Sequence, residues 1–333
     1  MNELDALYDL EKFDRALSYS RIVDFNKNGA EALVRVKKEI DSDGIRLGSL
    51  IDDLLLNKHN FNKIYLVFDG GKPIGNLAKL CNIILDNYIE IPSIEEMLEL
   101  CKKNKLWPRW KDERILQELN SEEFWNYIHA KFDSKNKTIV SSEDLEFAKE
   151  VVEVLLTHEN SSYIFNNNLE HYNQFKFTFE KSGFKIRGII DKVLIDHKKK
   201  TVKFIDLKTG KDSCSKFITS LLKWRYDLQA LIYTLAFPTF LKLTGLKGYK
   251  LLPFEFLYIS RYERIPLVYE TTKKWLKASK NGFTDTSGIK YKGLNELLEE
   301  IKWHINHNEF KLSKKIYESK GRLKLEDSFI TLE

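Results

Sequence analysis

Cysteine and long apolar segments are both scarce in this sequence, and each shortage excludes a class of protein. Three cysteines, widely spaced among 333 residues, cannot supply a disulfide framework, a four-cysteine zinc site or a four-cysteine iron–sulfur cluster from this chain alone. No apolar run approaches the roughly 18 residues that a membrane helix needs. The first residues include two acids and lack the apolar stretch of a secretory signal. We therefore expect a cytoplasmic protein with no membrane contact and no iron–sulfur cluster.

The chain carries little net charge, but its basic side chains are unevenly spread. The formal net charge is +5, whereas residues 196–225 alone hold nine basic and three acidic side chains. Two interpretations stay open. The lysines are solvated on the surface of a hairpin and a helix, or they form a cationic surface that faces phosphate groups.

The first 165 residues are predicted to be mostly helical. Apolar residues recur at helical spacing, and Ser18 or Ser20 can cap the start of a first helix. The predicted helices that follow cover residues 44–56, 94–101, 114–132 and 142–156. Within residues 106–111, two tryptophans lie next to basic residues. They either stack on unpaired bases or form an aromatic corner of the core.

An alternation that is typical of strands begins near residue 172. Phe175, Phe177 and Phe179 alternate with polar residues, and a Ser-Gly pair then makes a turn. Further predicted strands cover 184–195, 202–208, 251–260 and 266–270, and predicted helices cover 217–243 and 293–307. A three-strand meander, a long helix and a further strand together predict an α+β core.

Two acids and one lysine on neighbouring predicted strands carry the chemistry. Asp206 and Lys208 are two residues apart and share one face of a strand, while Leu207 between them points into the core. Asp191 ends an apolar run on the preceding strand, so a hairpin would bring it close to Asp206. Two carboxylates beside one ammonium can bind Mg²⁺ or Mn²⁺ and hold or activate a water. The alternative is a surface ion pair, the usual explanation of Asp-x-Lys on a strand.

The long predicted helix carries a polar stripe. Gln229 and Tyr233 are four residues apart and share one face, with Arg225 one turn earlier. Buried polar groups need partners, so a stripe on an otherwise apolar helix indicates contacts with a polar site. The alternative is that the stripe is the solvated edge of the helix.

Three short motifs occur in a fixed order along the chain. They are Gly188-Ile189-Ile190-Asp191, Asp206-Leu207-Lys208 and Gln229-Ala230-Leu231-Ile232-Tyr233. This G-x-x-D, D-x-K and Q-x-x-x-Y order resembles the PD-(D/E)XK nuclease superfamily, in its RecB-like and phage RecE-like exonuclease branch. Ser18-Tyr19-Ser20-Arg21-Ile22 is similar to the S-x-S-x-[IL] opening of that branch.

The resemblance implies a fold and a division of the chain. The fold is a restriction-endonuclease-like core, with a mixed sheet of three-strand meander, long helix and further strand, and a mostly helical N-terminal region. The helical region would cover 1–165 and contribute one active-site helix, about 45–56. The nuclease core would cover 166–262, and a C-terminal strand and amphipathic helix, 263–333, would pack on it.

The resemblance also implies a role for each residue of the first two motifs. Asp191 and Asp206 would bind one or two Mg²⁺ or Mn²⁺ ions, with help from the backbone carbonyl of Leu207. Lys208 would position or activate the attacking water.

Further residues are assigned more loosely by the resemblance. On the following helix, Gln229, Tyr233 and Arg225 would support the site or contact the DNA backbone. Glu170 lies just before the first strand, where RecE-like enzymes often place an acid, and Gln174 is nearby.

One helix departs from the family's pattern. The family has a G-x-x-x-H helix whose histidine reaches the metal, and the matching stretch here places Asp52 four residues after Gly48. A carboxylate is also a suitable hard ligand. Whether Asp52 or its neighbour Asp53 replaces the histidine stays open.

We therefore expect a Mg²⁺- or Mn²⁺-dependent DNA nuclease that hydrolyses phosphodiester bonds. The branch implies a phage-type 5′–3′ exonuclease of DNA recombination and repair, acting in the host cytoplasm. A single-strand-annealing partner and a homo-oligomeric ring are features of that branch. Two alternatives stay open: a structure-specific endonuclease, and a nucleic-acid-binding module with weak catalysis.

Overall fold

The computed structural model describes residues 16–35, 43–134 and 137–322. The chain divides into two compact units, Met1–Gly48 with Glu153–Glu333 and Ser49–Val152. These units differ from the three regions expected from the sequence. The N-terminal strand β1 (Leu17–Ser18) pairs with β5 (Phe184–Asp196), so the start of the described chain packs with the sheet and not with the helices that follow it.

The first unit is built on a mixed sheet of seven strands in the described residues. Its order is β1-β5-β6-β8-β9, with β4 also beside β5 and β7 also beside β6. The remaining strands are β4 (Glu170–Lys181), β6 (Thr201–Gly210), β7 (Lys250–Leu251), β8 (Glu255–Ser260) and β9 (Pro266–Glu270). β4, β5 and β6 form the predicted antiparallel meander, and β8 runs parallel to β6. The prediction of an α+β core is confirmed.

Two central strands of the sheet separate at one end. β5 pairs with β6 from Lys192 to Asp196, whereas Ile186 and Arg187 pair with β1 instead. The next pair in the β5–β6 register would be Asp191 with Asp206. These acids therefore stand where the two strands part, a place that we call the fork.

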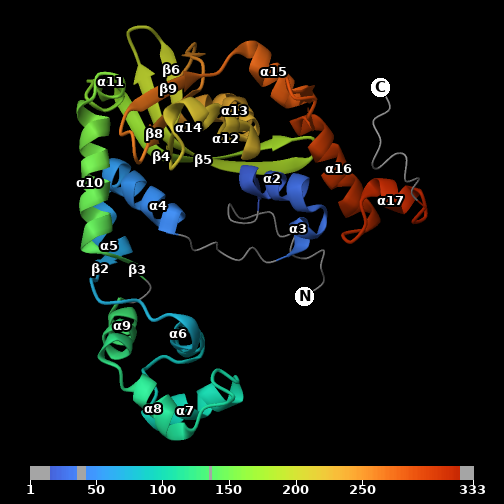
Figure 1. Ribbon diagram of the computed structural model, residues 1–333. Coiled ribbons are helices and arrows are strands. Elements are labelled where there is room, and N and C mark those ends of the chain that lie inside the picture. Colours follow the sequence, from blue (N-terminus) through green and yellow to red (C-terminus); the bar gives the residue numbers. More distant parts are fainter. Residues whose placement is uncertain (1–15, 36–42, 135–136, 323–333) are drawn as a thin grey trace. The chain divides into compact units, whose positions relative to one another are not determined.

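Three short helices cover one face of the sheet (Figure 1). They are α12 (Phe217–Lys223), α13 (Tyr226–Leu235) and α14 (Phe237–Thr244). The prediction of one helix over 217–243 is wrong for two local reasons. Arg225 has a φ of 55°, in the left-handed region that interrupts a helix. Pro238 has no backbone N–H to donate, so a new helix begins beside it at Phe237.

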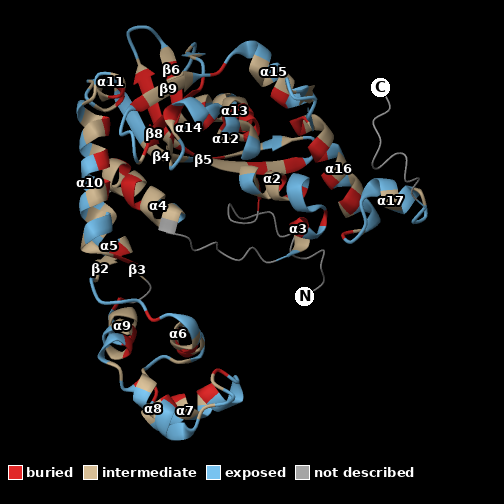
Figure 2. Ribbon diagram, viewed as in Figure 1, coloured by how far each residue is buried: buried red, intermediate tan, exposed pale blue. Residues whose placement is uncertain are grey.

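A proline also shortens the predicted strand 251–260. Pro253 lies between β7 and β8 and cannot donate a ladder hydrogen bond, so β8 begins only at Glu255. β8 is then buried along its whole length, as Figure 2 shows. β8 lies beside β6 in the sheet and pairs with it along Ile205 to Gly210, the stretch that carries Asp206 and Lys208.

Short helices surround the sheet in the first unit. Ser18 caps α2 (Tyr19–Asn28), because its Oγ accepts a hydrogen bond from the N–H of Arg21 at 3.2 Å. The expected amphipathic tail helix is present as α16 (Leu294–His307), and its apolar face is buried. The other elements are α3 (Glu31–Val34), α11 (Ser162–Phe165), η3 (Cys214–Lys216), α15 (Lys273–Asn281), β10 (Phe283–Thr284), β11 (Lys290–Tyr291), α16 (Leu294–His307) and α17 (Lys314–Glu318).

The second unit is mainly helical around its own apolar core. The predicted helix 114–132 is two helices, α8 (Asp112–Leu119) and α9 (Glu122–Asp133), which are separated by Asn120 and Ser121. The elements between residues 43 and 157 are α4 (Asp43–Leu56), η2 (Lys58–Asn60), α5 (Phe61–Ile64), β2 (Tyr65–Val67), α6 (Gly75–Asn87), α7 (Ile94–Lys103), α8 (Asp112–Leu119), α9 (Glu122–Asp133), β3 (Thr138–Val140) and α10 (Ser142–Thr157). β2 and β3 pair in parallel. In the described part of the chain, no helix is both long and apolar enough to span a bilayer.

The aromatic cluster of this unit belongs to its core. Trp107 and Trp110 stack with ring centroids 5.6 Å apart, and both pack against the buried helices. The guanidinium of Arg114 lies 4.0 Å above the ring of Trp110. These contacts favour the aromatic core corner over a base-stacking surface at this place.

Candidate active site

The fork brings Asp191, Asp206 and Lys208 together. An Oδ2 atom of Asp191 lies 2.8 Å from the backbone nitrogen of Leu207, which donates a hydrogen bond to it. The carboxyl groups of Asp191 and Asp206 lie close enough for each to influence the pKa of the other. The Nζ of Lys208 contacts Oδ2 of Asp206. Residues from two strands therefore meet in one small cluster.

The cluster is shielded from solvent. The side chain of Asp206 is 2% exposed and that of Lys208 is 18% exposed. Because both side chains are largely buried, Asp206 and Lys208 are not the exposed surface ion pair that usually explains Asp-x-Lys on a strand. Leu207 and its neighbour Ile205 are buried on the other side of β6, as the strand alternation predicts.

Burial controls the charge of the two acids. Burial, and after it the nearby charge of Asp206, raise the pKa of Asp191 to about 7. Burial likewise raises the pKa of Asp206, against the opposing effect of Lys208. Two such carboxylates can both ionise only with a cation between or beside them.

Lys208 is held as an ammonium ion. Burial lowers its pKa, but the charges of Asp206 and Asp191 outweigh this and raise the pKa well above its usual value. Its Nζ also lies 4.7 Å from the ring centre of Tyr226, a cation–π contact. In this arrangement Lys208 can donate hydrogen bonds but cannot accept a proton.

The polar stripe on α13 faces the cluster. Nε2 of Gln229 donates to Oδ1 of Asp206 at 2.7 Å and contacts the hydroxyl of Tyr233 at 3.1 Å. Both side chains belong to buried residues, so the stripe is not a solvated edge. Gln229 therefore orients the carboxylate of Asp206.

Gly188 is needed for this close packing. A Cβ atom at Gly188 would lie 2.3 Å from the ring of Phe177 and 2.8 Å from the ring of Tyr233. Glycine lets both rings lie against the backbone of β5, three residues before Asp191. This is a structural reason for the glycine of the G-x-x-D motif.

Two tyrosines beside Lys208 were missed by the sequence analysis. Tyr226 lies under the ammonium, and Tyr19 of α2 lies with its ring centroid 6.5 Å from that of Tyr226. Burial raises the pKa of both hydroxyl groups. Helical spacing could have revealed Tyr226, which is three residues before Gln229, whereas nothing local links Tyr19 to β6.

Other predicted residues make their contacts elsewhere. The guanidinium of Arg225 is buried against Asp227, with Nε 2.9 Å from Oδ1, and also donates to the carbonyl of Lys292. Glu170 is exposed and hydrogen-bonded to His197 at 2.7 Å. In the β4–β5 ladder Glu170 is opposite Ile195, four residues beyond Asp191.

Gln174, by contrast, occupies the position of β4 opposite Asp191. Its neighbours pair on either side, Asn173 with Lys192 and Phe175 with Ile190. Gln174 has a φ of 49°, an unusual value for a residue other than glycine. The strand is therefore distorted beside the fork, as is common at functional sites.

The predicted helix ligands lie on α4. Gly48 lies close to β6, because a Cβ atom there would be 3.1 Å from Oγ1 of Thr209. Asp52 belongs to the second unit, and its role as a ligand stays a prediction. Asp53 accepts a hydrogen bond from the hydroxyl of Tyr65 at 2.8 Å within that unit.

The donor set suits a hard divalent cation. Among residues 16–35, 43–134 and 137–322, no group of three or more His, Cys, Asp or Glu side chains gathers around one point. Asp191 and Asp206 would supply two carboxylates and Leu207 its carbonyl, with water and substrate completing the shell. Mg²⁺ is often bound in this way, by one or two carboxylates.

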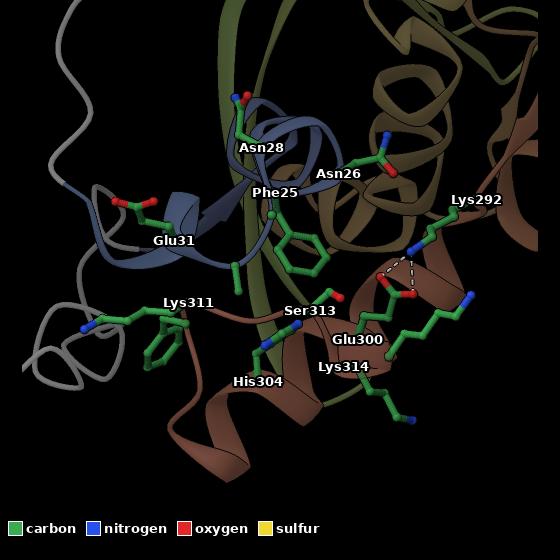
Figure 3. Close-up of a pocket in the computed structure, with 14 residues that line it drawn as sticks. Phe25, Asn26, Asn28, Glu31, Lys292, Glu300, His304, Lys311, Ser313 and Lys314 are labelled. Atoms are coloured by element: carbon green, nitrogen blue, oxygen red, sulfur yellow. Dashed lines mark hydrogen bonds and ion pairs between the residues drawn. The ribbon is translucent and has the colours of Figure 1, made fainter. Parts of the chain in front are cut away.

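The structure also has a hollow that contains none of the predicted site residues. Its volume is about 330 Å³, and residues of α2, α3, α16 and α17 line it. Figure 3 shows the ammonium of Lys292 paired there with the carboxylate of Glu300. The chemistry at the fork is therefore separate from this hollow.

Comparison with known proteins identifies one family. The sequence profile described as "PD-(D/E)XK nuclease superfamily" matches residues 17–262, which include the whole fork. No curated protein matches the chain.

Solved structures show weaker likeness. A protein from Eubacterium rectale named "Putative exonuclease" is 14% identical, with 98% of each chain covered and a TM-score of 0.45. SSO0001 is 12% identical, with 74% of this chain and 89% of that chain covered and a TM-score of 0.23. VC1899 from Vibrio cholerae is 14% identical, with coverage of 82% and 58% and a TM-score of 0.19. All three scores lie below 0.5, so the assignment rests on the family profile.

Proposed function

Since the chain belongs to the PD-(D/E)XK nuclease superfamily, we propose that it is a Mg²⁺- or Mn²⁺-dependent deoxyribonuclease. The observation that carries this proposal is the cluster of Asp191, Asp206 and Lys208 at the fork. A protein that only bound nucleic acid would not need two buried acids there, because carboxylates repel phosphates.

The chain's own residues prepare the site for phosphodiester hydrolysis. Asp191, Asp206 and the carbonyl of Leu207 would hold the metal, which supplies Lewis acidity and a nucleophilic water when bound. Gln229 fixes the orientation of Asp206 through its hydrogen bond. Lys208, as an ammonium, donates hydrogen bonds to the attacking water or to a phosphate oxygen and so positions the reacting groups.

The surrounding rings keep this site dry. Tyr19, Tyr226 and Tyr233 lie around the cluster, and each hydroxyl is buried enough to raise its pKa. A low local dielectric strengthens the attraction between the site and the charge that develops on the phosphate.

We propose further that the enzyme belongs to the RecE-like branch and degrades DNA from an end, in the 5′–3′ direction. The order of the three sequence motifs supports this assignment. Membership of this branch also implies a role in recombination or repair. It further implies a single-strand-annealing partner and a ring of several copies of the chain. In this proposal Asp52 of α4 takes the place of the family's histidine.

One assay tests both levels of the proposal. Linear duplex DNA, labelled at either end, is incubated with the protein in Mg²⁺ or in EDTA, beside covalently closed circles. An exonuclease shortens the linear DNA only in Mg²⁺ and leaves the circles intact, and the label released first gives the direction. Cutting of circles would favour the endonuclease alternative.

A matched pair of variants assigns any activity to the fork. Asp206→Asn keeps the size of the side chain but removes a ligand charge, so we expect activity to fall by on the order of 10³ or more. Asp196→Asn changes the same residue type at the hairpin end of β5, away from the fork, and should cleave like the wild type. If calorimetry detected no Mn²⁺ binding and no variant differed, the binding-module alternative would stand instead.

A further inference from the structure

An exposed tryptophan lies at the end of α12. The side chain of Trp224 is 46% exposed, and it takes no part in the apolar core of the first unit. Two ammonium groups lie near its ring, Lys27 of α2 at 5.9 Å and Lys223 at 5.3 Å from the ring centre. In the part of the chain that the structure describes, neither lysine has an ion-pair partner among the acids. Packing of the apolar core therefore does not explain why the ring of Trp224 is exposed with two lysines beside it.

Trp224 is connected to the fork by a short chain of contacts. Its backbone carbonyl accepts a hydrogen bond from the hydroxyl of Tyr19. Tyr19 lies beside Tyr226, and the ring of Tyr226 lies 4.7 Å from the ammonium of Lys208. Two aromatic rings thus separate the backbone of Trp224 from the catalytic lysine.

An indole face flanked by cations has the chemistry of a single-strand contact. Every nucleobase has a π-face that can stack on an exposed aromatic ring, whatever the base sequence. The neighbouring ammonium groups attract the phosphates that adjoin the stacked base. A base inside a duplex is already stacked on both sides, so such a platform selects an unpaired nucleotide.

We propose that Trp224, with Lys27 and Lys223, binds an unpaired nucleotide of DNA next to the phosphate that the fork cleaves. This inference rests on the proposed nuclease function and adds the substrate class, a single strand or a frayed duplex end. Trp224 supplies the stacking surface, and the two lysines contact the flanking phosphates.

A double-mutant cycle between protein and DNA tests the stacking contact. A short labelled single strand is bound in Ca²⁺, and each base in turn is replaced by an abasic site. We expect one abasic position to weaken binding to the wild type by about fivefold to a hundredfold. The same abasic position should have no effect on Trp224→Ala, and Trp224→Phe should retain part of the effect. The inference is overturned if Trp224→Ala binds as tightly as the wild type, or if the abasic effect persists in it.

Control variants show that the effect is local. Tyr317 of α17 is similarly exposed, at 45%, and lies against Trp303, so Tyr317→Ala should bind DNA like the wild type. Lys311→Ala removes a charge at the hollow of Figure 3 and should do the same. Lys27→Ala and Lys223→Ala should weaken binding and reduce its salt dependence.

Cleavage by the wild type in Mn²⁺ separates this inference from the proposed function. If the wild type cleaves DNA while Trp224→Ala and the abasic series show no loss, the stacking contact is wrong and the nuclease stands. If the wild type stacks the base but never cleaves, the nuclease fails and the stacking contact stands. If the wild type binds no single strand at all, the inference is overturned.

Discussion

Asp191 accepts a hydrogen bond from the backbone N–H of Leu207, across the fork between β5 and β6. In a continuous ladder this N–H would donate to a carbonyl of β5. Because the strands part there, a side chain replaces that carbonyl, and the buried N–H stays paired. The same contact holds the carboxyl group of Asp191 beside that of Asp206, so the geometry of the sheet and that of the site depend on one bond.

Asp191 should make the metal-free protein less stable as pH rises. Its pKa is raised to about 7, so between about pH 4 and pH 7 the folded state keeps a proton that the unfolded chain has lost. Through this window its carboxyl lowers the free energy of unfolding, by up to about 4 kcal/mol. Asp191→Asn should remove that decrease, which urea unfolding in EDTA at several pH values measures.

Asp196 serves as the control for this experiment. A backbone hydrogen bond from Lys199 lowers its pKa, so its contribution to stability has the opposite sign and is lost as pH falls. Asp196→Asn should therefore keep the wild-type decrease in stability between about pH 4 and pH 7. The same decrease in Asp191→Asn would show that another group causes it.

Binding of Mn²⁺ should release a proton and strengthen as pH rises through about 7. Burial and the nearby Asp206 raise the pKa of Asp191 to about 7, so below that pH its carboxyl group keeps a proton that a bound cation must displace. Calorimetry in two buffers of different ionisation enthalpy should find about one proton released below pH 7 and fewer above it. Affinity that does not change with pH would contradict this assignment of the ligands.

Lys208→Gln should abolish cleavage but keep the metal. We expect activity to fall at least about a hundredfold, because the variant loses the charge that positions water and phosphate. Mn²⁺ should bind as tightly or more tightly, since no ammonium contacts Asp206 any longer. Lys203→Gln is a matched control, because Lys203 also lies on β6 and pairs with a buried acid, Glu255. It should lose stability and keep cleavage.

Arg225 is predicted to stabilise the fold without contacting DNA. Arg225→Gln leaves the fully buried carboxylate of Asp227 without its ion pair, which should lower the free energy of unfolding by about 3 kcal/mol or more. Adding Asp227→Asn should restore part of that loss. Affinity for DNA, measured on the folded protein, should not change. A loss of affinity with normal stability would make Arg225 a DNA contact.

Much of the fold and the core of the site could be predicted from local patterns. Alternation along β4, β5 and β6 predicted the meander, and the two-residue period placed Asp206 and Lys208 on one face. The short hairpin between β5 and β6 then set the register that brings Asp191 opposite Asp206. Helical spacing placed Gln229 and Tyr233 together on one face of α13. Each of these relations depends on residues close in sequence or joined by a tight turn.

Other features were decided only by the tertiary structure. The fork exists because β1 pairs with β5 where β6 has left it, a contact between segments more than 160 residues apart. The contact of Tyr19 with Trp224, and the burial of Arg225 against Asp227 and Lys292, likewise join or enclose distant segments. The spacing of residues along the sequence does not predict such contacts. They form when distant segments pack onto the surfaces that the sheet leaves uncovered. The sequence by itself determined which acids face each other, and the packing of distant segments decided what surrounds them.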